Sequence, residues 1–149
     1  MIKGVFMNKG LLTAAIISIS CSSALFAAES CDDTALHGYM EHIKDEMRSM
    51  SSDIKSGNSG SASKHVNTLI MYFEKSRAET PYKFTAEQMQ GSELKNNKAD
   101  YEKVINETIS VLKNLDVALQ SGDQSEVRKW LGAMGNQRKQ GHSAFKANC

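Results

Sequence analysis

Proline and aromatic residues are scarce in this chain. Its 149 residues contain one proline, Pro81, and the aromatic side chains make up only 7%. Because proline breaks helix interiors, its scarcity favours long helices. Neither sign of charge is in excess, since 18 basic residues accompany 17 acidic ones. The chain therefore has no basic field that would hold a nucleic acid or an anionic membrane, and we expect neither as a partner.

The sequence signatures of several common chemistries are also missing. There is no Cys-x-x-Cys-His for covalent haem attachment, and there is no Glu-x-x-His pair of the di-iron bundles. His37 and His42 are five residues apart and fall on different helical faces, which disfavours a helical zinc pair. No nucleophile–base pair and no glycine-rich phosphate loop is present. We therefore expect a protein that is not an enzyme.

The first 27 residues have the pattern of a secretion signal peptide. Lys3 and Lys9 precede an uncharged segment, residues 11–26, and small residues surround a cleavage point after Ala27. A retained membrane anchor is the alternative, because the uncharged segment is almost long enough to cross a bilayer. Secretion predicts a periplasmic protein that is free of the membrane after cleavage. Residues 28–149 would then form one domain with 16 basic and 17 acidic residues, a net charge of −1.

Apolar residues recur every three or four positions in four segments, which predicts four amphipathic helices. The first helix is expected to begin at Asp32 or Asp33, either of which can cap it, and to end near Ile54. The second is expected over residues 62–78, because the residue before Pro81 disfavours helical geometry.

A long connection over residues 79–96 is predicted next, inside which Thr85-x-x-Gln88 could cap a short helical turn. The third helix has the most sustained stripe and ends at Ser121-Gly122. Asp123-x-x-Glu126 is a good start for the fourth. Because the first and third connections are short, neighbouring helices should be antiparallel. The expected fold is all-α, an up-down-up-down four-helix bundle.

The last helix carries a histidine on its apolar stripe. That stripe consists of Val127, Leu131, Met134, Arg138, His142 and Phe145. The stripe of the first helix contains Leu36, Met40, Ile43, Met47, Met50 and Ile54. If the two helices are adjacent, the Met40 thioether and the His142 imidazole face each other at one end of the bundle. These groups are the usual axial pair of a low-spin haem iron. The alternatives are a core histidine bonded to a neighbouring group and a methionine that only packs.

The spacings Leu36-x-x-x-Met40 and Arg138-x-x-x-His142, together with Thr80-Pro81, resemble the cytochrome b562 family. The resemblance extends over essentially the whole chain after the signal peptide. It implies one non-covalent b-type haem with Met40 and His142 as axial ligands.

Three further residues would contribute to such a haem site. The resemblance places Arg138 by the haem edge, where it can neutralise a propionate, and it places Tyr101 on the haem face. Ile43 could wall the same pocket as Tyr101. The family more often has phenylalanine at the Tyr101 position, and a second aromatic residue expected one turn further on is Ile105 here.

The resulting functional prediction is a periplasmic, monomeric electron carrier with redox proteins as its unidentified partners. Ligation by both a thioether and an imidazole fills the two axial positions, which blocks substrate binding and suits one-electron transfer. The alternative is a haem-free periplasmic bundle that acts in binding or in a stress response. Ile105 and three glycines in the last helix, Gly132, Gly135 and Gly141, motivate this alternative.

Two cysteines remain after signal cleavage, Cys31 and Cys149, one near each end of the domain. The periplasm favours disulfides. In an up-down-up-down bundle the first helix begins beside the place where the fourth one ends, so an intramolecular Cys31–Cys149 bond is expected. Alternatively, Cys149 pairs with another chain or stays reduced.

Overall fold

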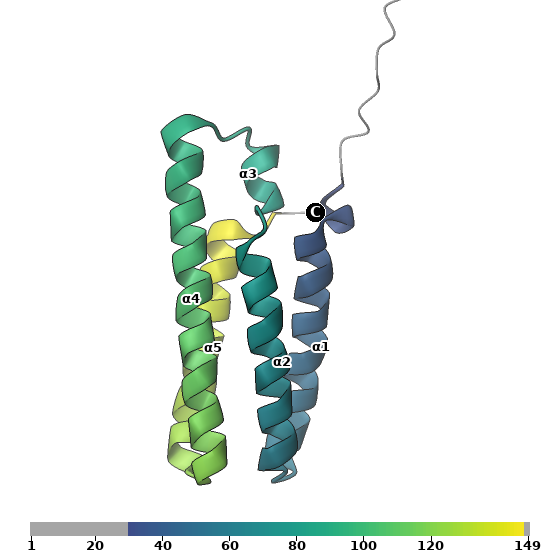
Figure 1. Ribbon diagram of the computed structural model, residues 1–149, viewed down its shortest axis with the longest axis vertical. Coiled ribbons are helices and arrows are strands. Elements are labelled where there is room, and N and C mark those ends of the chain that lie inside the picture. The colour runs from purple at the N-terminus through teal and green to yellow at the C-terminus, as the bar shows by residue number, and fades with distance from the viewer. Residues whose placement is uncertain (1–29, 148–149) are drawn as a thin grey trace, which may run out of the picture.

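The computed structural model describes residues 30–147, and all the regular structure in this part of the chain is helical. The elements are η1 (Cys31–Asp33), α1 (Ala35–Lys55), α2 (Ser59–Arg77), α3 (Tyr82–Ala86), α4 (Gly91–Ser121) and α5 (Gln124–Phe145). The four long helices run alternately up and down (Figure 1). The predicted all-α four-helix bundle is therefore confirmed. Within residues 30–147 no helix has the length and apolar character needed to cross a bilayer.

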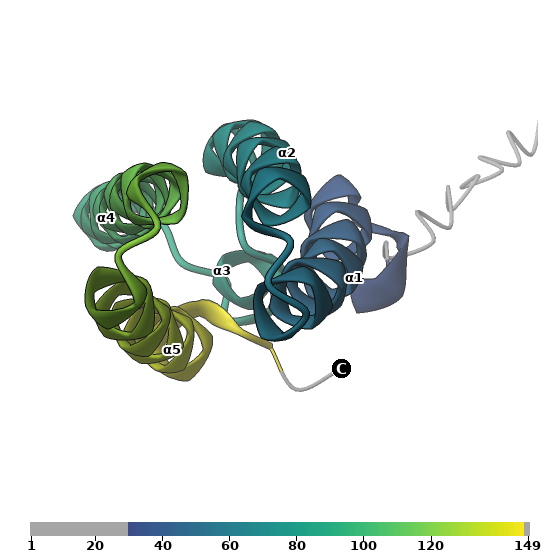
Figure 2. The same cartoon turned by 90° about the horizontal axis from the view of Figure 1, so that it is seen from below.

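The long helices form a ring in which consecutive members pack most closely. The close pairs are α1 with α2, α2 with α4, and α4 with α5, whereas α1 and α5 approach each other much less (Figure 2). The start of α1, the end of α5 and the short helix α3 lie at the same end of the bundle (Figure 1). The two helices expected to carry haem ligands are thus the neighbours that pack least tightly.

The buried side chains form two clusters. The long cluster runs through the body of the bundle and is built around residues such as Met50, Leu69, Leu112 and Leu115, which are fully buried. The end cluster closes the end where α3 lies. Its buried members are Phe84, Tyr101, Ile105 and Ile109, and Leu36, Ile70, Phe73, Met89, Leu94 and Phe145 pack against them. Every helix from α1 to α5 contributes to the end cluster.

The caps of the first and last long helices differ in how well the sequence predicted them. Thr34, not Asp32 or Asp33, caps α1, because its hydroxyl accepts the His37 N–H at 3.1 Å. The predicted start of α1 is therefore wrong: both aspartates lie in η1, where Asp33 accepts a 2.6 Å hydrogen bond from the Ser30 hydroxyl. Asp123 does cap α5 as predicted.

The connection between the second and third long helices is shorter than predicted. It covers residues 78–90 and contains α3, and α4 begins at Gly91 instead of near residue 97. Thr85 does not cap α3, which starts directly after Pro81. The first turns of α4 are polar, and Leu94 is their one large apolar residue. They therefore show no apolar stripe that would have predicted a helix. The segment assigned as a polar connection supplies Phe84, which is 1% exposed.

Candidate haem site

Met40 lies near the start of α1, where it is partly buried and packs against the long cluster. Ile43, one turn further on, is a buried member of the same cluster. The apolar stripe predicted for this helix therefore does face the core. The thioether sulfur of Met40 is a soft, uncharged donor that can be held in such apolar surroundings without an unpaired charge.

His142 lies in the last turn of α5 and is exposed. The predicted core-facing stripe of α5 is therefore wrong at Arg138 and His142, although it holds at Val127 and Met134. Its imidazole forms no hydrogen bond or ion pair with another described residue. Partial desolvation lowers the pKa of His142, and the nearby cations Arg138 and Lys146 lower it further. The neutral form is consequently favoured near pH 7, and this is the form that ligates a metal.

Arg138 lies one turn before His142 and is exposed. It forms no ion pair with the acidic side chains of residues 30–147. With Lys146, it places positive charge on both sides of the candidate ligand along α5. Cations near the end of a helix interact favourably with its dipole, and the same charges would attract the propionates of a haem.

Tyr101 is buried in the end cluster, where it is 4% exposed. Its ring meets the Phe145 ring edge-to-face with 5.4 Å between centroids, and its hydroxyl donates a 2.8 Å hydrogen bond to the Ser76 carbonyl. Burial raises the pKa of Tyr101, and Glu79 adds to this effect, so the phenol stays neutral. Tyr101 and Ile43 belong to different clusters, which places them on two separate parts of the apolar interior.

The residues present fit a b-type haem in their donor chemistry. A thioether and an imidazole lie on α1 and α5 at the same end of the bundle, on the two neighbours that pack least closely (Figures 1 and 2). The end cluster provides apolar surface beside them, with Leu36 on α1 and Phe145 on α5. No group of three or more His, Cys, Asp or Glu side chains in residues 30–147 is arranged to hold a metal ion by itself.

Sequence reasoning missed two residues of this end, Lys83 and Phe84, because both lie in the predicted connection. The Lys83 ammonium donates a 2.8 Å hydrogen bond to the Ala144 carbonyl, two residues after His142. The Phe84 ring meets the Phe145 ring edge-to-face with 6.0 Å between centroids. The Pro81-Tyr82 start and the two aromatic residues within three positions were the available signal for a buried helical turn.

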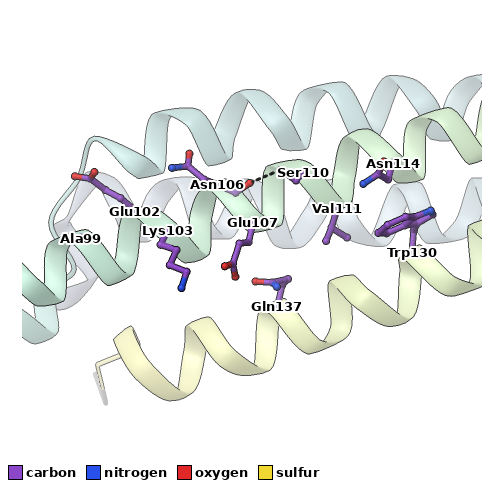
Figure 3. A pocket seen from close by; sticks show the side chains of 10 residues that line it. All are labelled: Ala99, Glu102, Lys103, Asn106, Glu107, Ser110, Val111, Asn114, Trp130 and Gln137. Atoms are coloured by element: carbon purple, nitrogen blue, oxygen red, sulfur yellow. Dashed lines mark hydrogen bonds between the residues drawn. The ribbon is translucent and has the colours of Figure 1, made fainter.

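An open groove of about 660 Å³ runs between α4 and α5, away from the predicted ligands (Figure 3). Most of the residues that line it are polar, Glu107 and Gln137 among them, and Trp130 adds an aromatic ring, while neither Met40 nor His142 contributes to it. The side-chain carbonyl oxygen of Gln137 is buried without a hydrogen-bond partner. The groove thus offers none of the predicted haem ligands.

A comparison with known families decides the family of the chain. The sequence pattern of the family described as cytochrome b562 matches residues 35–146, from the start of α1 to the residue after α5. The chain belongs to the cytochrome b562 family. This family consists of small four-helix-bundle cytochromes that bind b-type haem, and the matched range includes both Met40 and His142. The chain has no significant match among curated proteins or among solved structures.

Two further predictions involve residues outside the described range. The signal peptide was assigned to residues 1–27, all of which lie outside it. Cys31 lies in η1, but its predicted partner Cys149 is also outside the described residues. Both remain predictions.

Proposed function

We propose that this cytochrome b562 family member is a periplasmic electron carrier that binds one non-covalent b-type haem through Met40 and His142. One observation carries the proposal. The only histidine of α5 and a methionine of α1 lie at the same end of the bundle, on neighbouring helices that make the fewest close contacts with each other. Family membership supports the identity of the cofactor, because the match covers both helices.

A bound haem would supply a reversible one-electron couple at its iron. The residues of the chain contribute binding and electrostatics. The lowered pKa of His142 keeps its imidazole unprotonated and available, and Met40 offers a sulfur from an apolar wall. Arg138 and Lys146 would attract the haem propionates, and the apolar end cluster would exclude water from one side of the cofactor.

Reconstitution of the purified protein with haemin tests the proposal. The reduced-minus-oxidised absorption spectrum of the wild type should be that of a six-coordinate, low-spin b-type cytochrome. Met40→Ala should give a five-coordinate, high-spin iron, and His142→Ala should weaken haem retention more. Met71→Ala, at an exposed methionine of α2, and His42→Ala, at an exposed histidine of α1, are matched controls that should keep the wild-type spectrum.

Two outcomes would contradict the proposal in different ways. If the Met40→Ala/His142→Ala double variant binds haem equally well and stays low-spin, the ligand assignment is wrong. If the wild type takes up no haem and remains colourless, the protein is a haem-free helical bundle with another role.

A further inference from the structure

The end of α5 is intrinsically weak, although it carries the proposed ligand. Gly132, Gly135 and Gly141 lie within this helix, and each lowers helix stability by about 1 kcal/mol relative to alanine. The last four carbonyls of any helix also lack partners within it. The two residues of α5 that are buried, Val127 and Met134, both lie before its last three turns. Something outside α5 must hold the turn that contains His142.

A lysine from α3 supplies one of the missing partners. Lys83 donates its 2.8 Å hydrogen bond to the carbonyl of Ala144, which belongs to the last turn of α5. This bond connects residues 61 positions apart in the sequence. An ammonium group at a helix C-terminus both satisfies a free carbonyl and interacts favourably with the helix dipole.

A phenylalanine from the same short helix supplies apolar contact. Phe84, next to Lys83, is almost fully buried and meets the ring of Phe145, the last residue of α5. Phe145 in turn meets Tyr101 of α4. The end of α5 is therefore held between an apolar contact and a polar one, and both come from α3.

We propose that Lys83 and Phe84 form a strap that fixes the last turn of α5 and so positions His142 as a ligand. The ligand role rests on the proposed haem binding, whereas the strap itself concerns the protein without haem. Neither residue needs to touch the cofactor, so both are positioning residues. When the last turn frays, His142 leaves the binding-competent arrangement, and the apparent affinity falls with the fraction of competent molecules.

Hydrogen exchange of the haem-free protein tests the strap directly. Lys83→Met keeps the length of the side chain and removes the donor and the charge. Amides of residues 142–146 should exchange about fivefold faster in this variant, whereas those of α2 should not change. Lys95→Met is the matched control. Lys95 is exposed near the start of α4, and its ammonium group forms no hydrogen bond or ion pair with another described residue. Unchanged exchange in Lys83→Met would overturn the strap.

Haem transfer to an excess of an acceptor protein tests the positioning role. Lys83→Met should release haem severalfold faster than wild type or Lys95→Met, and Lys83→Arg, which keeps a charged donor, should restore most of the difference. The absorption spectrum should stay low-spin, because the ligands are retained. Phe84→Leu, which keeps an apolar side chain but loses the edge-to-face contact, should also accelerate release.

The two experiments separate the possible failures. If the wild type binds no haem, the proposed function fails while the exchange measurement still decides the strap. If exchange in residues 142–146 accelerates but haem is released at wild-type rates, the strap exists and its positioning role is wrong.

Discussion

Replacing a glycine of α5 by alanine should stabilise the protein without haem. A Cβ atom added at Gly132 meets no other atom within 4 Å, and one added at Gly141 meets only the Val104 side chain at 3.6 Å, an ordinary contact distance. Neither glycine has the positive φ that would oppose a side chain. Alanine therefore brings the difference in helix propensity, about 0.8–1 kcal/mol, without a steric cost.

The two substitutions should act independently. Nine residues of helix separate them by about 13 Å, beyond the range over which substitutions usually couple. The double variant should gain about 2 kcal/mol, and for a domain of this size its Tm should rise by about 8 °C. Urea and thermal unfolding followed by far-UV circular dichroism measure both quantities.

The comparison between the two positions gives the refuting result. If Gly132→Ala stabilises and Gly141→Ala destabilises, the contact with Val104 is tighter than its distance implies. If neither variant gains stability, helix propensity does not limit the stability of α5, and the reasoning is refuted. Gly141 precedes His142 directly, so a weaker haem affinity of Gly141→Ala alone would show that the glycine provides room for the cofactor.

Four other predictions concern single interactions. Tyr101→Phe should lower the free energy of unfolding by about 1 kcal/mol, measured with urea, because it loses its phenol hydrogen bond. Asp123→Ala should cost about 1 kcal/mol in the same assay, because two α5 amides lose their cap. The pKa of His142 is lower in the folded protein, so the unfolded chain binds the proton more readily. The free energy of unfolding of the haem-free protein should therefore fall as pH drops through about 6.5. His142→Gln should flatten this pH dependence. A disulfide bond between Cys31 and Cys149 should raise the free energy of unfolding by about 4–5 kcal/mol. Peptide mass spectrometry without reductant should find the two cysteines linked. Free thiols in protein from the periplasm would contradict this.

The fold was predictable because each long helix has either a sustained stripe or a strong boundary. Asp123 is a helix boundary that the sequence alone identified. It follows Gly122 and precedes the apolar Val127 by four residues, which is the place of an N-cap. The start of α1 was not identified, because Asp32, Asp33 and Thr34 are all good caps. The structure places both aspartates in η1, which leaves Thr34 as the residue that caps α1.

The sequence predicted the place of Met40 on the core side of α1, whereas His142 is exposed, and the ligand role of both residues stays a prediction. The phases of Met40 and His142 follow from helical periodicity, which is a local property. The contacts of Lys83 with Ala144 and of Phe84 with Phe145 join residues 61 positions apart, and no local pattern reports such a distance. Sequence reasoning also expected Ile43 and Tyr101 to wall one pocket, whereas the packing assigns them to different clusters.

The helices of the two proposed ligands differ in where their buried residues lie. α1 and α5 each pack closely on one long helix, α1 on α2 and α5 on α4. The buried residues of α5, Val127 and Met134, both lie before its last three turns. His142 is therefore exposed in a turn without a fully buried residue, whereas Met40 is partly buried one turn before the buried Ile43. A ligand that binds only the ordered state stabilises it by mass action. Haem bound at His142 would thus stabilise the end of α5. Before haem binds, that end is held by the contacts of Ala144 and Phe145 with α3 and α4, together with the predicted Cys31–Cys149 bond.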